Sequence, residues 1–140
     1  MSGLAAPADV LPHRPPFLLL DEVSELTVGV SARGRWSLTG AEAFFAGHFP
    51  GRPTLPGVLM LESIAQLGAY AVLSDPAYAG KLPLFGGVDK ARFRRQVGPG
   101  DVLSLEIELG RMSARAGKGH GWARVGGETA CEADLLFVFA

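Results

Sequence analysis

The sequence predicts an α+β fold in which an antiparallel sheet of about five or six strands wraps around one long central helix. From Pro56 or Gly57 to about Leu73, apolar residues occupy almost every helical face, a pattern typical of a helix buried on most sides. Elsewhere, 19 glycines and 10 prolines divide the chain into short segments, which favours strands joined by tight turns. Packing a curled sheet on an apolar helix buries both apolar surfaces at once.

The alternation of apolar and polar residues is clearest at Val102–Met112, where Leu103, Leu105 and Ile107 alternate with polar side chains. The turn signal Pro99–Asp101 directly precedes this segment. Because most strands follow one another closely in the sequence, we expect antiparallel pairing. The expected strands, in chain order, are Phe17–Leu20, Ser31–Leu38, Val102–Met112, Gly121–Val125 and Glu128–Phe139.

The length and composition indicate a single domain over residues 1–140. Hydrophobic residues make up 48% and charged residues 19%, a balance that argues against disorder. Lysine and arginine (13) nearly cancel aspartate and glutamate (14), so the formal net charge is -1. The chain therefore lacks the basic balance expected of a nucleic-acid-binding protein.

The sequence also favours a cytoplasmic location. Cys131 is the single cysteine and cannot form an internal disulfide, which fits a reducing compartment. Residues 1–12 lack the charged segment and long apolar stretch of a secretory signal. The longest apolar-rich run, Val58–Leu73, contains Glu62 and Gln66 and is shorter than the roughly 18 to 20 residues that cross a bilayer. No membrane span is predicted.

His48 has the most suggestive setting of the three histidines. It lies in Gly47–Gly51, within a long Gly- and Pro-rich loop (residues 40–56) that directly precedes the apolar helix. Loops of this length in a compact domain are usually functional. The alternative is that His48 merely caps the loop. His13, after a proline, and His120, between two glycines, are expected to be structural or surface residues, His120 in an exposed turn.

Glu62 is the second unusual residue, because acidic side chains are almost never buried in an apolar helix unless paired or functional. Gln66 lies one turn later on the same face and can hydrogen-bond the carboxyl group. The alternative is that both face solvent on a thin polar stripe. At the helix start, Thr54 could cap an amide, and the Gly57 amide could instead receive a substrate carbonyl oxygen.

A base, an acid and an oxyanion donor together suit one reaction, the elimination of water from a 3-hydroxyacyl thioester. Imidazole suits removal of the C2 proton near neutral pH. A carboxyl group in an apolar helix can be kept protonated by desolvation and can donate to the departing hydroxyl. No cofactor is required. No metal is expected either, because Cys131 and the dispersed histidines lack ligand spacing.

With these residues in view, the chain resembles the 3-hydroxyacyl-[acyl-carrier-protein] dehydratases of type II fatty-acid synthesis, in their broad-specificity, non-isomerising branch. The resemblance runs from about residue 11 to the C-terminus, and its middle two segments are the most specific. The matching segments are Leu11–Asp21, Phe45–Pro53, Leu55–Gln66, and Asp89–Arg95 followed by Pro99–Asp101.

The resemblance implies a hot-dog fold and assigns roles within these segments. It makes His48 the catalytic histidine and Glu62 the helix carboxylate, with Gly57 contacting the thioester carbonyl and Gln66 supporting the carboxyl group. It also implies a homodimer or a trimer of dimers, in which each site takes its histidine and its carboxylate from opposite subunits. A cis peptide near the histidine is associated with this fold, so His48–Phe49 is the bond to inspect.

Further substrate and partner contacts follow from the same resemblance. We expect Phe49 and Val58, which adjoin His48 and Gly57, to contact the substrate. The carrier protein is acidic, so we expect it to dock on the densest cationic cluster of this chain. The alternative is that this cluster is ordinary solvated charge. This basic cluster consists of Lys90, Arg92, Arg94 and Arg95, the first three expected on one face of a strand.

Two differences from the family pattern affect the acyl tunnel more than the chemistry. Gln96 and Gly98 replace a usual proline-valine continuation, and residues 80–85 lack the usual aromatic pair. Phe85 and Phe93 could line or gate the tunnel, although core packing is the favoured role of each. Two alternative functions stay open: a hot-dog acyl thioesterase in which Glu62 activates water, and a non-catalytic acyl-binding partner subunit of a synthase.

Overall fold

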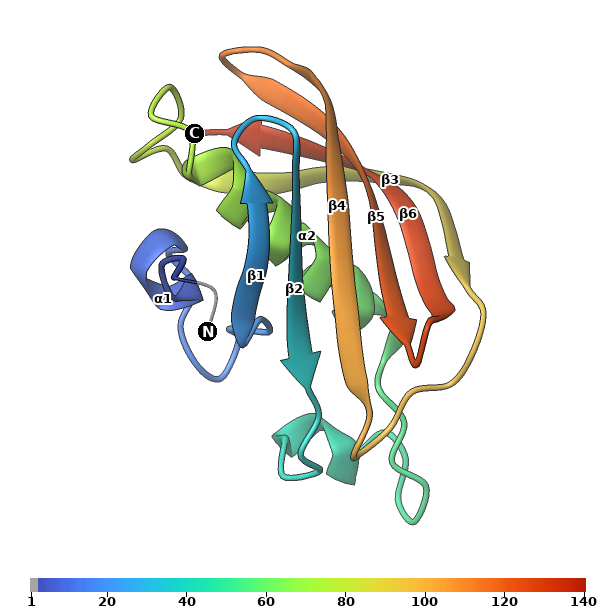
Figure 1. Cartoon of the computed structure of the whole chain (residues 1–140). Helices are drawn as coiled ribbons and strands as arrows, with labels where there is room; N and C mark the ends of the chain where they lie inside the picture. The colour runs from blue at the N-terminus through green and yellow to red at the C-terminus, as the bar shows by residue number, and fades with distance from the viewer. Residues whose placement is uncertain (1–2) are drawn as a thin grey trace.

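A computed structural model of the chain describes residues 3–140. Six strands, one long helix, one short helix and a 3-10 turn make up the fold (Figure 1). The helices are α1 (Pro7–Val10) and α2 (Gly57–Leu73), with η1 (Ala43–Ala46) between β2 and α2. The strands are β1 (Glu22–Thr27), β2 (Ser31–Ser37), β3 (Pro83–Phe93), β4 (Val102–Met112), β5 (Ala116–Val125) and β6 (Glu128–Phe139).

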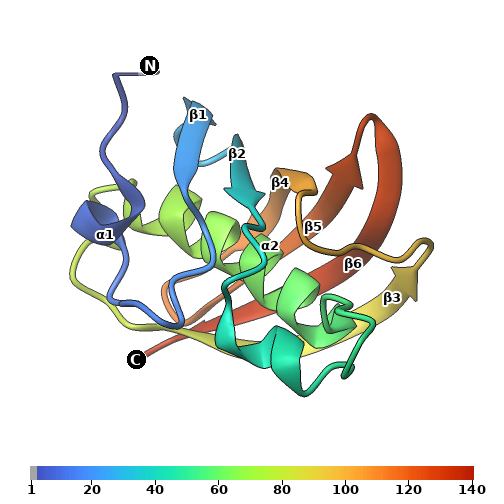
Figure 2. The ribbon, with the colours of Figure 1, turned by 90° about the horizontal axis from the view of Figure 1, so that it is seen from below.

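The six strands form one antiparallel sheet in the order β1-β2-β4-β5-β6-β3. The sheet curls, and α2 lies along its inner side (Figure 2). This arrangement confirms the predicted α+β hot-dog fold. The predicted bounds of α2, β4 and β6 are also confirmed, and β2 ends one residue before the expected Leu38. The region 40–56 is irregular apart from η1.

The helix packs closely on β5 because glycines replace side chains on the inner face of that strand. A Cβ on residue 121 would collide with the Ile64 side chain of α2, and one on residue 119 would lie 3.1 Å from Ile107. Between these glycines, His120 points to the other face of the sheet. The predicted exposed turn at His120 is therefore wrong, because the Gly-His-Gly pattern reflects close helix packing within a strand.

The predicted first strand, Phe17–Leu20, is also wrong. Its backbone is bonded to a helix side chain instead of a neighbouring strand, since the Leu19 N–H donates to Gln66 Oε1 and the Phe17 carbonyl accepts from Gln66 Nε2. The first strand begins at Glu22. The strand expected from Gly121 begins earlier, at Ala116.

The edge strand β3 was only partly expected. It carries two register shifts against β6, one between Phe85 and Gly87 and one between Asp89 and Arg92, and Lys90 has a φ of 53°. These irregularities break the simple alternation that would place Lys90, Arg92 and Arg94 on one face. Within residues 3–140, no helix combines the length and the apolar character needed to cross a bilayer.

Candidate active site

His48 lies in the loop before α2, with one ring nitrogen already engaged. Its Nδ1 lies 2.8 Å from the carbonyl oxygen of Thr54, whose own N–H donates to the His48 carbonyl at 2.8 Å. The His48–Phe49 peptide is cis, and the two rings stack with centroids 4.0 Å apart. Because a carbonyl oxygen only accepts, Nδ1 carries a proton and Nε2 of the neutral ring keeps a lone pair. That nitrogen can act as a general base.

The start of α2 offers a free amide. Pro56 is the N-cap residue, and no side chain caps the first turn. The cap that Thr54 could have formed is absent, and its hydroxyl instead donates to the Arg52 carbonyl. Within residues 3–140 the Gly57 N–H has no acceptor, and a Cβ on this residue would lie 2.8 Å from the Phe93 ring. A glycine amide at a helix start can donate to a developing oxyanion.

Glu62 lies in the second turn of α2, where Gln66 holds its carboxyl group. Gln66 Nε2 donates to Glu62 Oε2 at 2.9 Å and to the Phe17 carbonyl at 2.8 Å. The other end of the amide, Oε1, accepts from the Leu19 N–H at 2.7 Å. Gln66 is fully buried, and these three bonds fix which end of its amide faces Glu62. The expected support of the carboxyl group by Gln66 is present.

His13 lies against the same carboxyl group, although the sequence placed it with structural or surface residues. Its Nε2 is 3.7 Å from Glu62 Oε2, and the two side chains are 21% and 19% exposed. Both line a pocket of about 210 Å³ between α2, β3 and β6. The other lining residues are apolar: Phe17, Ala65, Ala69, Pro83, Leu84, Phe85 and Phe137. A carboxyl group in an apolar helix needs polar neighbours, and this was the signal in the sequence that could have pointed to a residue such as His13.

His48 and Glu62 are not brought together within one chain. Among the described residues 3–140, no hydrogen bond or ion pair joins them, and His48 does not line the pocket at Glu62. Phe49 and Val58 are 50% and 69% exposed on the single chain. Among the described residues of one subunit, His48 and Glu62 therefore share neither a bond nor a pocket.

The basic cluster is partly neutralised by the neighbouring strand. Arg94 makes a two-nitrogen contact with Glu132, at 2.6 and 3.0 Å, and Arg95 pairs with Glu128 at 3.1 Å. Lys90 and Arg92 have no ion pair among residues 3–140. The hydrogen bond from Arg94 lowers the pKa of Glu132 below its ordinary value, so the Arg94–Glu132 ion pair persists at neutral pH.

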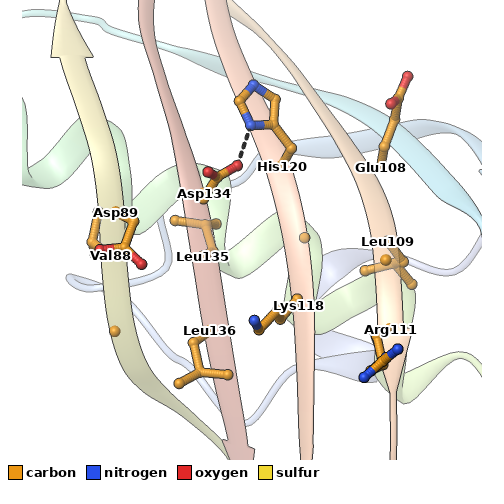
Figure 3. A pocket seen from close by; sticks show the side chains of 13 residues that line it. Val88, Asp89, Glu108, Leu109, Arg111, Lys118, His120, Asp134, Leu135 and Leu136 are labelled. Atoms are coloured by element: carbon orange, nitrogen blue, oxygen red, sulfur yellow. Dashed lines mark hydrogen bonds and ion pairs between the residues drawn. The ribbon is translucent and has the colours of Figure 1, made fainter.

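A second histidine–carboxylate pair lies on the sheet face turned away from α2 (Figure 3). His120 Nδ1 is 2.5 Å from Asp134 Oδ1, beside an open hollow of about 690 Å³. The hydrogen bond from His120 lowers the pKa of Asp134, which therefore remains a carboxylate at neutral pH. Within residues 3–140, no three His, Cys, Asp or Glu side chains gather in a way that could hold a metal ion.

Residues 11–134 match the family model described as a FabA-like domain. The chain belongs to this family. It is 56% identical over 128 residues to a Moorella thermoacetica protein named 3-hydroxyacyl-[acyl-carrier-protein] dehydratase FabZ, covering 91% of this chain and 90% of that protein. A protein of the same name from Desulforamulus reducens is 51% identical over 137 residues, covering 98% and 96% of the two chains.

A solved structure supports the fold independently. The dehydratase heterocomplex ApeI:P from Xenorhabdus doucetiae superposes with a TM-score of 0.84, covering 98% of this chain and 92% of that chain. Its sequence identity is 18%, so this likeness concerns the fold alone. The family expected from the sequence segments is confirmed by the family model and by the two relatives described above.

Proposed function

We propose that the protein dehydrates (3R)-3-hydroxyacyl-[acyl-carrier-protein] to the trans-2-enoyl product in fatty-acid or related acyl-chain biosynthesis. The observation that carries this proposal is Glu62, a carboxyl group in an apolar pocket, with a buried amide donating to one of its two oxygens. The family relatives named as such dehydratases support the same reaction.

In the proposed mechanism, Nε2 of His48 removes a proton from C2 of the acyl chain. The Gly57 amide stabilises the negative charge that develops on the thioester oxygen. Glu62 donates its proton to the C3 hydroxyl, which leaves as water while the C2–C3 double bond forms. The protonated His48 then returns the proton to Glu62 through solvent or product water, so the enzyme needs no cofactor.

The two reactive groups would meet across a homodimer, which also forms the repeating unit of any trimer of dimers. β3 is an edge strand of 11 residues that exposes Leu84, Phe85, Val88 and Phe93. The opposite edge, β1, is only six residues long. A long apolar edge strand favours pairing with another chain. Because Leu84 and Phe85 also line the Glu62 pocket, a partner at β3 would lie beside it.

Phe49 and Val58 fit a role in substrate binding, because both expose apolar surface next to the base and the free amide. Lys90 and Arg92 are the members of the basic cluster best placed to meet an acidic carrier protein, since Arg94 and Arg95 are already paired. We also propose that the chain works as one domain in the cytoplasm, consistent with its buried, free Cys131.

The test is an assay of enoyl-thioester formation with wild-type protein and the variants His48→Ala and Glu62→Ala. We expect both substitutions to reduce kcat by about 10²-fold or more, the range for general acid–base groups. Near-normal rates in either variant would reject the assignment. Release of free thiol without enoyl absorbance would instead indicate a thioesterase, and acyl binding without turnover would indicate a binding subunit.

A further inference from the structure

We propose that His13 is a positioning residue for the acid of the reaction: as a neutral imidazole it directs Glu62 to donate its proton from Oε1. This inference rests on the proposed function. It assigns His13 no contact with the substrate, only an effect on the carboxyl group beside it.

The position of His13 is set by its own segment. The Arg14 guanidinium turns back and donates to the Leu11 and His13 carbonyls, at 2.8 and 2.7 Å. Leu11 is buried and anchors the segment in the core. Six residues after His13, the Leu19 N–H donates to Gln66 Oε1. The segment that carries His13 is therefore fixed in the core at Leu11 and bonded to α2 at Leu19.

His13 and Gln66 both lie next to the same oxygen of the Glu62 carboxyl group. Gln66 Nε2 donates to Glu62 Oε2 at 2.9 Å, and His13 Nε2 lies 3.7 Å from that same atom. The other oxygen, Oε1, has no partner among residues 3–140. If Oε2 faces two donors, a proton on the carboxyl group is favoured on Oε1.

The second ring nitrogen of His13, Nδ1, indicates whether the ring beside Glu62 is neutral or protonated. Nδ1 is buried and has no hydrogen-bond partner within residues 3–140. In an imidazolium this nitrogen would carry a buried N–H without an acceptor, which is strongly unfavourable. A neutral ring with its proton on Nε2 leaves only a bare lone pair at Nδ1 and places its donor nitrogen 3.7 Å from Glu62 Oε2.

Neutrality matters because of what else faces the pocket. His13 and Glu62 are the only titratable side chains among the residues that line it, and the Arg14 guanidinium is engaged with backbone carbonyls. A permanent cation at position 13 would hold Glu62 as a carboxylate through Coulomb attraction and remove the proton that the reaction needs. A neutral donor orients the carboxyl group without this effect.

Three substitutions test the proposal in the full-length protein. A glutamine places a neutral N–H donor near the position of Nε2, whereas an asparagine reaches only as far as Nδ1. We expect His13→Gln to keep near-normal kcat, and His13→Asn to lower kcat about tenfold with little change in KM. His13→Lys should move the descending limb of the pH–kcat profile to lower pH. The matched control is His120→Leu, which removes the histidine of the His120–Asp134 pair on the sheet face turned away from α2.

Each result decides the proposal. Equal kcat values for His13→Gln and His13→Asn, or an unchanged pH profile in His13→Lys, would overturn it, provided thermal unfolding shows that the variants are folded. If His13→Asn fails to fold, the Gln and Lys variants still decide. Loss of activity in Glu62→Ala together with wild-type behaviour of all His13 variants would reject the role of His13 alone. Retained activity in Glu62→Ala would reject the proposed function itself.

Discussion

Two histidine–carboxylate pairs lie on opposite sides of the sheet, and they differ in the distance between the groups and in exposure. On the outer face, His120 and Asp134 make a 2.5 Å contact and are 36% and 43% exposed. On the inner side, His13 and Glu62 are 3.7 Å apart and about half as exposed. The shorter contact belongs to the open surface, and the looser one belongs to the apolar pocket.

Under the proposed function, the pair with the longer contact serves catalysis and the pair with the shorter contact does not. The outer contact lowers the pKa of Asp134 and so keeps it ionised, unable to donate a proton near neutral pH. Glu62 instead receives a neutral amide donor on one oxygen and keeps the other free within the pocket. The two carboxyl groups therefore differ in the partners that they bond and in the polarity of their surroundings.

The largest effect should come from neutralising Glu62, with the same change at Asp134 as the comparison. Glu62→Gln preserves the shape but removes the exchangeable acid, and we expect kcat to fall about 10²- to 10⁴-fold. Asp134→Asn, the matched change on the outer face, should leave kcat near the wild-type value. Steady-state dehydration assays on both variants test this contrast. Similar losses in the two variants would remove the distinction between the pairs.

A smaller effect is expected from Gln66→Leu. This substitution removes the donor to Glu62 and leaves the Leu19 N–H and the Phe17 carbonyl unpaired. We expect about a tenfold lower kcat and a loss of about 1–3 kcal/mol in the free energy of unfolding. Ser63→Ala is the control on the same helix, because Ser63 is buried and, among residues 3–140, its hydroxyl bonds only to the Met60 carbonyl. An effect on stability without one on kcat would show that Gln66 serves packing alone.

The smallest effect concerns the outer pair and acid stability. Folding lowers the pKa of Asp134 through its hydrogen bond with His120. The His120–Asp134 pair therefore stabilises the fold at pH values above the usual pKa of a carboxyl group, and this contribution is lost as pH falls below about 4. His120→Leu should therefore be less stable than wild type near pH 6, with the difference shrinking near pH 3. Urea unfolding at the two pH values measures it. A difference that is constant with pH would contradict the assignment.

The sequence predicted the elements whose burial is uniform or strictly alternating. The apolar helix Gly57–Leu73 and the alternating strand Val102–Met112 have the predicted bounds for this reason. The edge strand β3 was not among the predicted strands, because most of its residues are exposed on a single chain and bulges interrupt the alternation of its side chains. Phe17–Leu20 looked like a strand, but a glutamine side chain satisfies its backbone.

The same reasoning explains what was found and missed at the site. His48 and Glu62 stand out locally, one in a Gly- and Pro-rich loop and the other in an apolar helix. The environments of His13 and His120 depend on contacts far away in the chain, with Glu62 and with Asp134. No local pattern encodes those contacts. The spacing of Glu62 and Gln66, in contrast, is a property of one helix and was readable directly.

The central claim is that the base of one subunit works with the acid of the other. Co-folding equal amounts of His48→Ala and Glu62→Ala subunits tests it, because each variant alone lacks one group at every site. If sites are shared between subunits, random assembly leaves both groups intact at about a quarter of them, and about a quarter of the wild-type activity should return. Mass spectrometry of the mixture would verify that the two chains have combined. Activity no higher than that of the separate variants, in a mixture shown to contain both chains, would contradict the account.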